Sequence, residues 1–350
     1  MRGNIHERKG LILRFFTAVQ KAVPGALIAG AVLVSLPAGA EPPALSLPAD
    51  CDIGTSCWLV NFVDHDPGPG ARDYRCGALS YDTHKGTDIA IRNDAAMNAG
   101  VDVLAAAPGK VVGTRDGMPN STRADLESAT ALRGRDCGNG VRIDHGDGWS
   151  TQYCHMMAGS IRVRTGDAVE RGQALGRIGR SGRTEFPHIH VSLRQGDRVV
   201  DPFTGESNIQ ACDADTQASG LWDPAVRQAL AYPGPQPFHL GFASGRPKTA
   251  EIESGMLNRS QFPADSAALV FWAEAFSLKK GDTVTLSLTA PDGSTVADHT
   301  IDLDRPLAKG RWFTGRRKRG PAWEKGEYTG TITITRDGAR VRKSTAAVVE

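Results

Sequence analysis

The sequence lacks a large net charge, and this absence excludes one broad class of function. Its 350 residues include 41 Lys and Arg and 39 Asp and Glu, a formal net charge of +2 at pH 7. Residues 1–40 carry five basic residues and one acidic residue, so the rest of the chain has a net charge of −2. Proteins that bind nucleic acid present a strong positive field. The sequence therefore predicts no nucleic-acid partner.

The sequence also lacks a hydrophobic run of the length that a membrane-spanning helix needs, roughly 20 residues. The apolar run from about Val23 to Leu36 is shorter and contains Pro24 and Gly25. Basic residues precede it and Ala38-Gly39-Ala40 follows, a pattern typical of a secretory signal peptide over residues 1–40. We expect a periplasmic or secreted protein with no stable membrane insertion after cleavage. An uncleaved anchor is the alternative, and the absence of a Cys directly after the site disfavours a lipoprotein.

No C-x-x-C pair occurs, which argues against a cysteine zinc site. All six cysteines lie beyond residue 40, and an even number in an exported chain favours disulfides. Six cysteines allow 15 pairings. A short Cys51–Cys57 loop and a Cys137–Cys154 bridge across a hairpin suit the spacing, which would leave Cys76 with Cys212, but the sequence does not decide among the pairings.

Short strands and turns dominate what is present, and the expected fold class is all-β. Strands are predicted over residues 101–106 and 109–113, and a hairpin over residues 141–155 turns at Gly146-Asp147-Gly148. The polar stretch 118–135 lacks this alternation and is expected to be an inserted surface loop with one helical turn around residues 124–131. A roof over a substrate cleft is the alternative for this loop.

Beyond residue 206 the organisation changes. Residues 207–237 contain Trp222-Asp223-Pro224 and are expected to be a linker with a short helix. Residues 238–350 contain alternating strands at about 268–273, 283–288 and 328–334, which predict an immunoglobulin-like β-sandwich. We find no internal repeat and no catalytic constellation in this part. Its basic run Arg311–Arg319 is expected to be a solvated loop, although docking on an anionic wall polymer or a cell-envelope protein partner is the alternative.

Two short motifs predict a metal site. Alternate side chains of a strand project to one face, so His188 and His190 would point the same way. His84 and Asp88 add a nitrogen and an oxygen ligand from another segment. Either motif alone is weak evidence, but three His and Asp ligands with one open position are typical of hydrolytic zinc.

Two further motifs lie between these, in a definite order. Tyr153-x-His155 ends the predicted hairpin, and Gly166-Asp167-x-Val169-x-x-Gly172-Gln173 precedes the H-x-H strand. The chain from about Gly77 to Phe203 thus resembles the lysostaphin-type (LytM-like) zinc metallopeptidases, which cut peptide bonds in peptidoglycan. The resemblance implies an antiparallel β-sheet peptidase domain, placed at residues 76–206 after a lead-in at 41–75.

By the same resemblance, one Zn²⁺ per chain would be held by His84, Asp88 and His190, with His155 and His188 beside the zinc-bound water as the catalytic pair. The implied protein is an exported zinc metalloendopeptidase that hydrolyses peptidoglycan stem-peptide cross-links. Cys154 is expected to point away from the face of His155, and Tyr153 to share that face.

Alternatives remain open at this point. A catalytically silent LytM-like module that activates another cell-wall hydrolase is disfavoured because every ligand position is kept. A lipoyl-type carrier is disfavoured because the region offers no lysine at a hairpin tip. The lead-in 41–75 is a candidate for blocking the cleft, and its Asp64-His65-Asp66 is expected to be a solvated turn rather than a second metal site.

Overall fold

The computed structural model describes residues 41–350, except 122, 129, 131, 207–211, 214–219 and 258. The predicted signal peptide lies outside these residues, as do parts of the predicted linker. Pro42–Glu350 form one compact unit. Among the described residues, no helix has the length and apolar character needed to cross a membrane.

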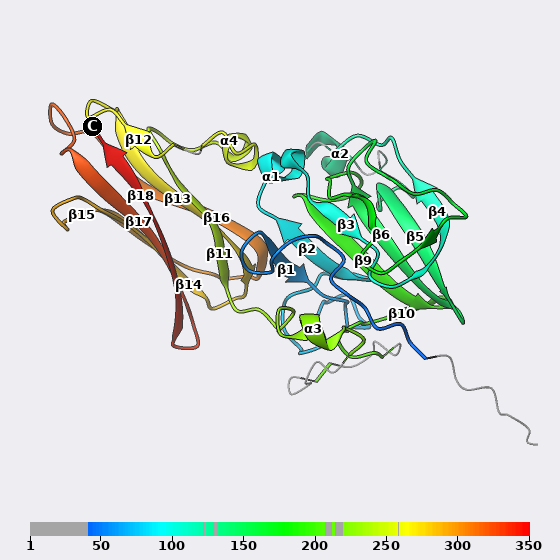
Figure 1. Ribbon diagram of the computed structural model, residues 1–350. Coiled ribbons are helices and arrows are strands. Elements are labelled where there is room, and N and C mark those ends of the chain that lie inside the picture. The colour runs from blue at the N-terminus through cyan, green and yellow to red at the C-terminus, as the bar shows by residue number, and fades with distance from the viewer. Residues whose placement is uncertain are drawn as a thin grey trace, which may run out of the picture. The chain divides into compact units, whose positions relative to one another are not determined.

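A large antiparallel sheet fills the first half of the described chain (Figure 1). Its neighbouring strands, in order, are β1 (Cys57–Asn61), β2 (Thr87–Ile91), β9 (His188–Gln195), β6 (Trp149–Met156), β5 (Asn139–Gly146), β4 (Gly109–Arg115) and β7 (Ala168–Val169). A further strand, β10 (Arg198–Val200), pairs with β9, and β3 (Asp102–Leu104) pairs with β8 (Ala174–Arg177). Two short helices, α1 (Asp94–Ala99) and α2 (Arg123–Glu127), lie between strands. The predicted all-β class is confirmed.

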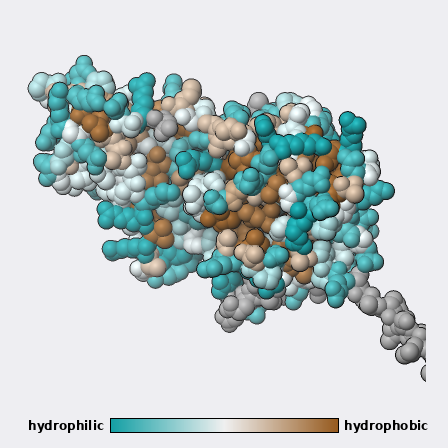
Figure 2. Space-filling model, in the orientation of Figure 1, coloured by the Kyte–Doolittle hydropathy of each residue, from teal (hydrophilic) through white to brown (hydrophobic). Residues whose placement is uncertain are grey.

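Strand β9 shows how sequence alternation positions the site. Ile189, Val191 and Leu193 are buried on one face, where apolar side chains leave water. His188, His190 and Ser192 consequently occupy the opposite face. The register sets Asp88 of β2 opposite His190 and Cys154 of β6 opposite the same residue. Figure 2 shows apolar residues gathered over this half of the visible face, with hydrophilic residues around them.

The lead-in is built into this sheet. Strand β1 pairs with β2, and Trp58, Val60 and Phe62 are fully buried. The prediction of a solvated turn at Asp64-His65-Asp66 is wrong, because Asp64 and His65 are 5% and 2% exposed. The Asp64 carboxylate accepts hydrogen bonds from three backbone N–H groups, and His65 Nε2 lies 2.7 Å from Asp201 Oδ2.

The second half consists of two sheets. One contains β11 (Gln236–Ala243), β13 (Ala268–Leu278) and β16 (Leu307–Arg317). The other contains β12 (Gln261–Phe262), β18 (Ala339–Val349), β17 (Gly326–Arg336), β14 (Thr283–Thr289) and β15 (Thr295–Asp302). In these two sheets every strand pair except β12–β18 is antiparallel. Helices α3 (Pro224–Arg227) and α4 (Thr249–Glu253) precede and follow β11. Leu269 and Phe271 of the first sheet share one core with Leu286 and Ile332 of the second, which makes a sandwich. Its assignment as immunoglobulin-like remains a prediction.

The basic run at Arg311–Arg319 lies mainly in a strand. Residues up to Arg317 belong to β16, which pairs with β13 from Ala268 to Leu278. The expectation of a solvated loop is therefore wrong for most of the run.

Three disulfides join Cys51 with Cys57, Cys76 with Cys212, and Cys137 with Cys154. This is the pairing that the spacing favoured. The third disulfide links the segment before β5 to β6, and it lies beside the site described next.

Candidate metal centre

The two predicted motifs meet on one face of the large sheet. His84 Nε2, Asp88 Oδ1 and His190 Nδ1 form the group of potential metal ligands in the described part of the chain. His84 Nε2 lies 3.1 Å from Asp88 Oδ1 and 3.0 Å from His190 Nδ1, and the last two atoms are 2.8 Å apart. Ligand atoms around tetrahedral zinc are separated by about 3.3 Å, given bonds of about 2.0–2.1 Å. A small outward movement of each atom would accommodate the ion.

The hydrogen bonds behind the ligands support the same conclusion. His84 Nδ1 lies 2.6 Å from the carbonyl oxygen of Phe62, an acceptor, so this nitrogen carries the proton. Burial lowers the pKa of His84, but the Asp88 carboxylate outweighs this effect and raises it. The neutral form, which metal binding requires, would turn a lone pair on Nε2 toward the Asp88 carboxylate and His190 Nδ1. Three atoms with lone pairs at such distances repel one another unless a proton or a metal cation lies between them. The donor set of two imidazoles and one carboxylate fits Zn²⁺.

Three neighbouring groups support the ligands, and sequence reasoning missed two of them, Asn61 and Ser192. Asn61 donates from Nδ2 to Asp88 Oδ2 at 2.9 Å, and Ser192 Oγ lies 3.0 Å from His190 Nε2. Gly86 lets the loop approach β9, since a Cβ there would lie 2.6 Å from the Val191 carbonyl oxygen. Hydrogen-bond partners of this kind fix ligand tautomers and orientations. Of the two missed residues, only Ser192 had a sequence signal, the two-residue spacing from His190.

His155 reaches the site through an unusual backbone conformation. Its φ is +65°, in the left-handed region that non-glycine residues seldom adopt. This turn breaks the alternation of side chains along β6. It places the centre of the His155 ring 4.7 Å from the centre of the His188 ring. Two contacts hold it: the His155 N–H donates to the Cys137 carbonyl, and Nδ1 donates to the Ser181 carbonyl.

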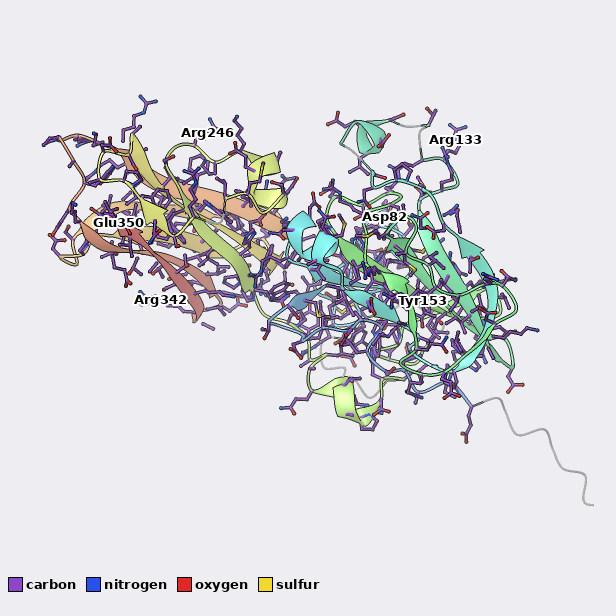
Figure 3. The ribbon with its side chains drawn as sticks, turned by 45° about the horizontal axis from the view of Figure 1, so that its top comes forward. Asp82, Arg133, Tyr153, Arg246, Arg342 and Glu350 are labelled. Atoms are coloured by element: carbon purple, nitrogen blue, oxygen red, sulfur yellow. A yellow bond between two sulfur atoms is a disulfide. The ribbon has the colours of Figure 1, made fainter. Side chains whose placement is uncertain are left out.

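Both expectations about the neighbours of His155 are therefore wrong. Cys154 lies opposite His190 in the register and lines the same cleft as His155. Tyr153 is fully buried on the other side, where its hydroxyl accepts from the Ala106 N–H at 2.8 Å. Figure 3 shows Tyr153 among the strands of the sheet. The two-residue rule fails here because it assumes an extended residue at position 155.

His188 is positioned by the segment before β9. Its Nδ1 lies 3.0 Å from the Phe186 carbonyl oxygen and 2.9 Å from Thr184 Oγ1. Its Nε2 lies 3.6 Å from Asp88 Oδ1, next to the potential ligand group. All five residues singled out from the sequence thus come together at one place.

The charge states of Asp88 and His155 depend on their burial and on the neighbouring histidines. Burial opposes ionisation of Asp88, but the charges of His84 and His188 and hydrogen bonds from His190 and His84 hold the pKa of its carboxyl well below the usual range. Burial, together with His188 and His190, puts the pKa of His155 well below its ordinary value. Near neutral pH Asp88 is therefore a carboxylate and His155 a neutral base with its lone pair on Nε2.

Two of the potential ligands, His84 and His190, and the neighbouring His155 line a cleft of about 370 Å³. Its lining includes Tyr81, Lys85, Arg183 and Arg194, along with the Cys137–Cys154 disulfide. Arg183 pairs with Asp136 at 2.7 Å, so Lys85 and Arg194 give this cleft a net positive charge. None of its lining residues comes from 41–75.

The part of the chain that carries this site is similar to known proteins. Residues 82–202 match the model of "Peptidase family M23". Over 118 residues the chain is 36% identical to the peptidoglycan DD-endopeptidase ShyA of Vibrio cholerae, an alignment that covers 34% of this chain and 22% of the relative. Over 64 residues it is 34% identical to the cell division protein DipM of Caulobacter vibrioides, covering 18% and 10%.

A solved structure is also similar in part. The catalytic domain of the prophage-encoded M23 protein EnpA from Enterococcus faecalis aligns with 46% of this chain and 92% of its own, at 25% identity and a TM-score of 0.27. The curated relatives are matched over less than a quarter of their own lengths. The resemblance to LytM-like metallopeptidases is confirmed by the family match at residues 82–202.

Proposed function

We propose that the chain, whose residues 82–202 match the model of peptidase family M23, is an exported zinc metalloendopeptidase that hydrolyses peptide cross-links of peptidoglycan. The observation that carries the proposal is the ligand triad His84, Asp88 and His190 with two further histidines at its edge. The name of the Vibrio cholerae relative, a peptidoglycan DD-endopeptidase, supports the substrate class. Three disulfides support a periplasmic or extracellular location.

The roles of the residues follow from their contacts. His84, Asp88 and His190 would hold the ion, and Zn²⁺ bound there supplies a Lewis acid that lowers the pKa of water to about 7. His155 is neutral, and its Nδ1 proton is fixed on the Ser181 carbonyl, so Nε2 can accept a proton from the attacking water. His188, fixed through Nδ1 by the Phe186 carbonyl, directs Nε2 to the same space, and in its imidazolium form, with a proton on each nitrogen, it would donate from Nε2 to the developing oxyanion. The amine of the cleaved bond leaves with a proton from His155.

The cleft charge agrees with this substrate class. Lys85 and Arg194 lie in the cleft, while residues 41–350 as a whole have a net charge of −2. Arginine binds carboxylates through paired N–H donors. A cationic cleft around the ligands therefore suits a peptide that carries free carboxylates, as peptidoglycan stem peptides do.

The test is muropeptide release from purified peptidoglycan by residues 41–350, with zinc and with a chelator. We expect zinc-dependent loss of cross-linked dimers. The His190→Ala variant should lose both zinc and activity. The His155→Ala variant should keep zinc at one ion per chain but lose about 10²–10⁴-fold in rate, the usual contribution of a general base. His145→Gln, a change on the same hairpin but outside the cleft, is the matched control.

Two results would contradict the proposed function. A folded wild-type protein that holds one zinc and cleaves no cross-link would sink the endopeptidase proposal and favour the silent activator module. Activity that survives chelation and the loss of His190 would show that the triad is not the catalytic centre.

A further inference from the structure

The sandwich contains a cleft of about 900 Å³, larger than the cleft at the metal centre. It is lined by the loop after β11, the start of β13, the second half of β16, and Asp298 and His299 of β15. We call it the sandwich cleft and define it by Arg246, Ala268, Val270, Phe313 and Arg317. No residue of the metal centre takes part in it.

The floor of the sandwich cleft is apolar and carries an exposed aromatic ring. Register pairs Phe313 with Trp272 and Gly315 with Val270, so Phe313 and Gly315 occupy one face of β16 two residues apart. Phe313 is 40% exposed. A Cβ on Gly315 would lie 2.5 Å from the Leu269 carbonyl oxygen, so this position is restricted to glycine. The result is a flat ring beside a position without a side chain.

The rim is positively charged. The Arg246 guanidinium lies 5.7 Å from the centre of the Phe313 ring, and Arg316 lies 5.9 Å from that of Trp323. Arg311 is neutralised by Glu274 and Glu253. Within the described part of the chain, no carboxylate forms an ion pair with Arg246, Arg316 or Arg317, and Asp298 is the one acidic residue of the lining. The sandwich cleft therefore has a net charge of about +2 at neutral pH.

We propose that the sandwich cleft binds a glycan chain that carries carboxylates. The exposed face of Phe313 offers a stacking surface for the C–H face of a pyranose ring, and sites of this type combine aromatic contact with few polar groups. The Arg246 guanidinium lies over the Phe313 ring and Arg317 lines the same cleft, and each can bind a carboxylate through two N–H groups. Peptidoglycan strands freed of stem peptides provide this chemistry, because each lactyl-bearing sugar then has a free carboxylate. This binding does not depend on the proposed hydrolytic activity.

The test uses residues 41–350 with His190→Ala, so that no cleavage disturbs equilibrium binding. Two ligands share the sugar backbone but differ in charge: peptide-free peptidoglycan strands and neutral chitin oligosaccharides. We expect binding to the first and at least 10-fold weaker binding to the second. Charge reversal by Arg246→Glu with Arg317→Glu should weaken binding at least 10-fold, and Phe313→Ala should do the same. Added salt should weaken binding by screening the arginines.

Matched controls lie in the other sheet. Arg342→Glu makes one such charge reversal on an exposed arginine of β18 (Figure 3), and Val341→Ala trims an exposed apolar side chain there. Both should stay within 2-fold of the parent. Equal affinity for the two glycans, or unchanged affinity in the Arg246, Arg317 and Phe313 variants, would overturn the proposal. No binding of the parent to peptide-free strands would also overturn it, and binding to intact peptidoglycan alone would assign the cleft to stem peptides.

Discussion

At the residue scale, side-chain chemistry was easier to predict than side-chain direction. Ligand types and spacing pointed to His84, Asp88, His188 and His190, because few residue types bind zinc and a strand aligns alternate side chains. The direction of Tyr153 and Cys154 was predicted wrongly. Alternation assumes extended backbone throughout, and the φ of +65° at His155 depends on contacts with Cys137 and Ser181, which are distant in sequence.

The hydrogen bond from Asn61 to Asp88 gives a prediction at this scale. Asn61→Ala leaves Asp88 Oδ2 without its buried donor, so we expect zinc affinity to fall about 10–100-fold. Competition with a chromogenic chelator measures this directly. Asn93→Ala removes another buried amide, one that caps α1, and should leave zinc affinity unchanged. Equal zinc affinity in the Asn61 variant and the wild type would show that this contact does not position the ligand.

At the element scale, the β5–β6 hairpin holds the proposed base. The Cys137–Cys154 disulfide and the hydrogen bond from His155 to Cys137 tie the same two segments. Changing both cysteines to serine should cost about 3 kcal/mol of stability by the loop-entropy model. It should also lower kcat about 10²-fold, because a displacement of about 1 Å in a catalytic group has such an effect.

Two controls distinguish a displaced His155 from a general loss of stability: the zinc content of the double variant, and a variant of a second cysteine pair. None of the three ligands lies on the hairpin, so the double variant should keep its zinc. Cys51→Ser with Cys57→Ser removes a disulfide away from the cleft and should leave kcat of the folded protein unchanged. If the Cys137/Cys154 variant were less stable but kept the wild-type kcat, the disulfide would stabilise the fold without positioning His155.

The three-stranded sheet of the sandwich contains a buried charge network with a pH signature. Burial raises the pKa of Glu274, but the hydrogen bond from His239 and the charges of Lys309 and Arg311 outweigh it and lower the pKa from 4.5 to about 2. A carboxyl with a depressed folded pKa stabilises the fold above its unfolded pKa, and this stabilisation is lost as pH falls toward 2. The shift corresponds to about 3 kcal/mol.

Urea unfolding from pH 7 to pH 3 tests this network. Glu274→Gln should be less stable than wild type by about 3 kcal/mol at pH 7, and the difference should shrink below about pH 4.5. Glu327→Gln, an exposed change on β17, should track the wild type at every pH. A constant difference between Glu274→Gln and wild type across this range would contradict the linkage.

At the scale of the whole molecule, the sequence indicated the order of parts but not how they join. Strand propensity and turn residues predicted two β-rich regions. They could not show that the lead-in supplies β1, or that Trp58, Ala90 and Phe186 share a buried cluster with Phe238 and Phe276. Contacts between residues so far apart in sequence leave no local pattern. The cluster matters to the site because the carbonyl of Phe186 orients His188.

The distribution of cysteines has a consequence for how the protein matures. All six lie between Cys51 and Cys212, and residues 238–350 contain none. In a reducing compartment the sandwich can complete its core, whereas the metal-bearing half lacks three covalent links, one of which joins residues 136 positions apart. We expect hydrolytic competence to arrive only after oxidation. If the chain is exported as we propose, the cell that makes it would be protected from its activity until the chain has left the cytosol, with no inhibitor required.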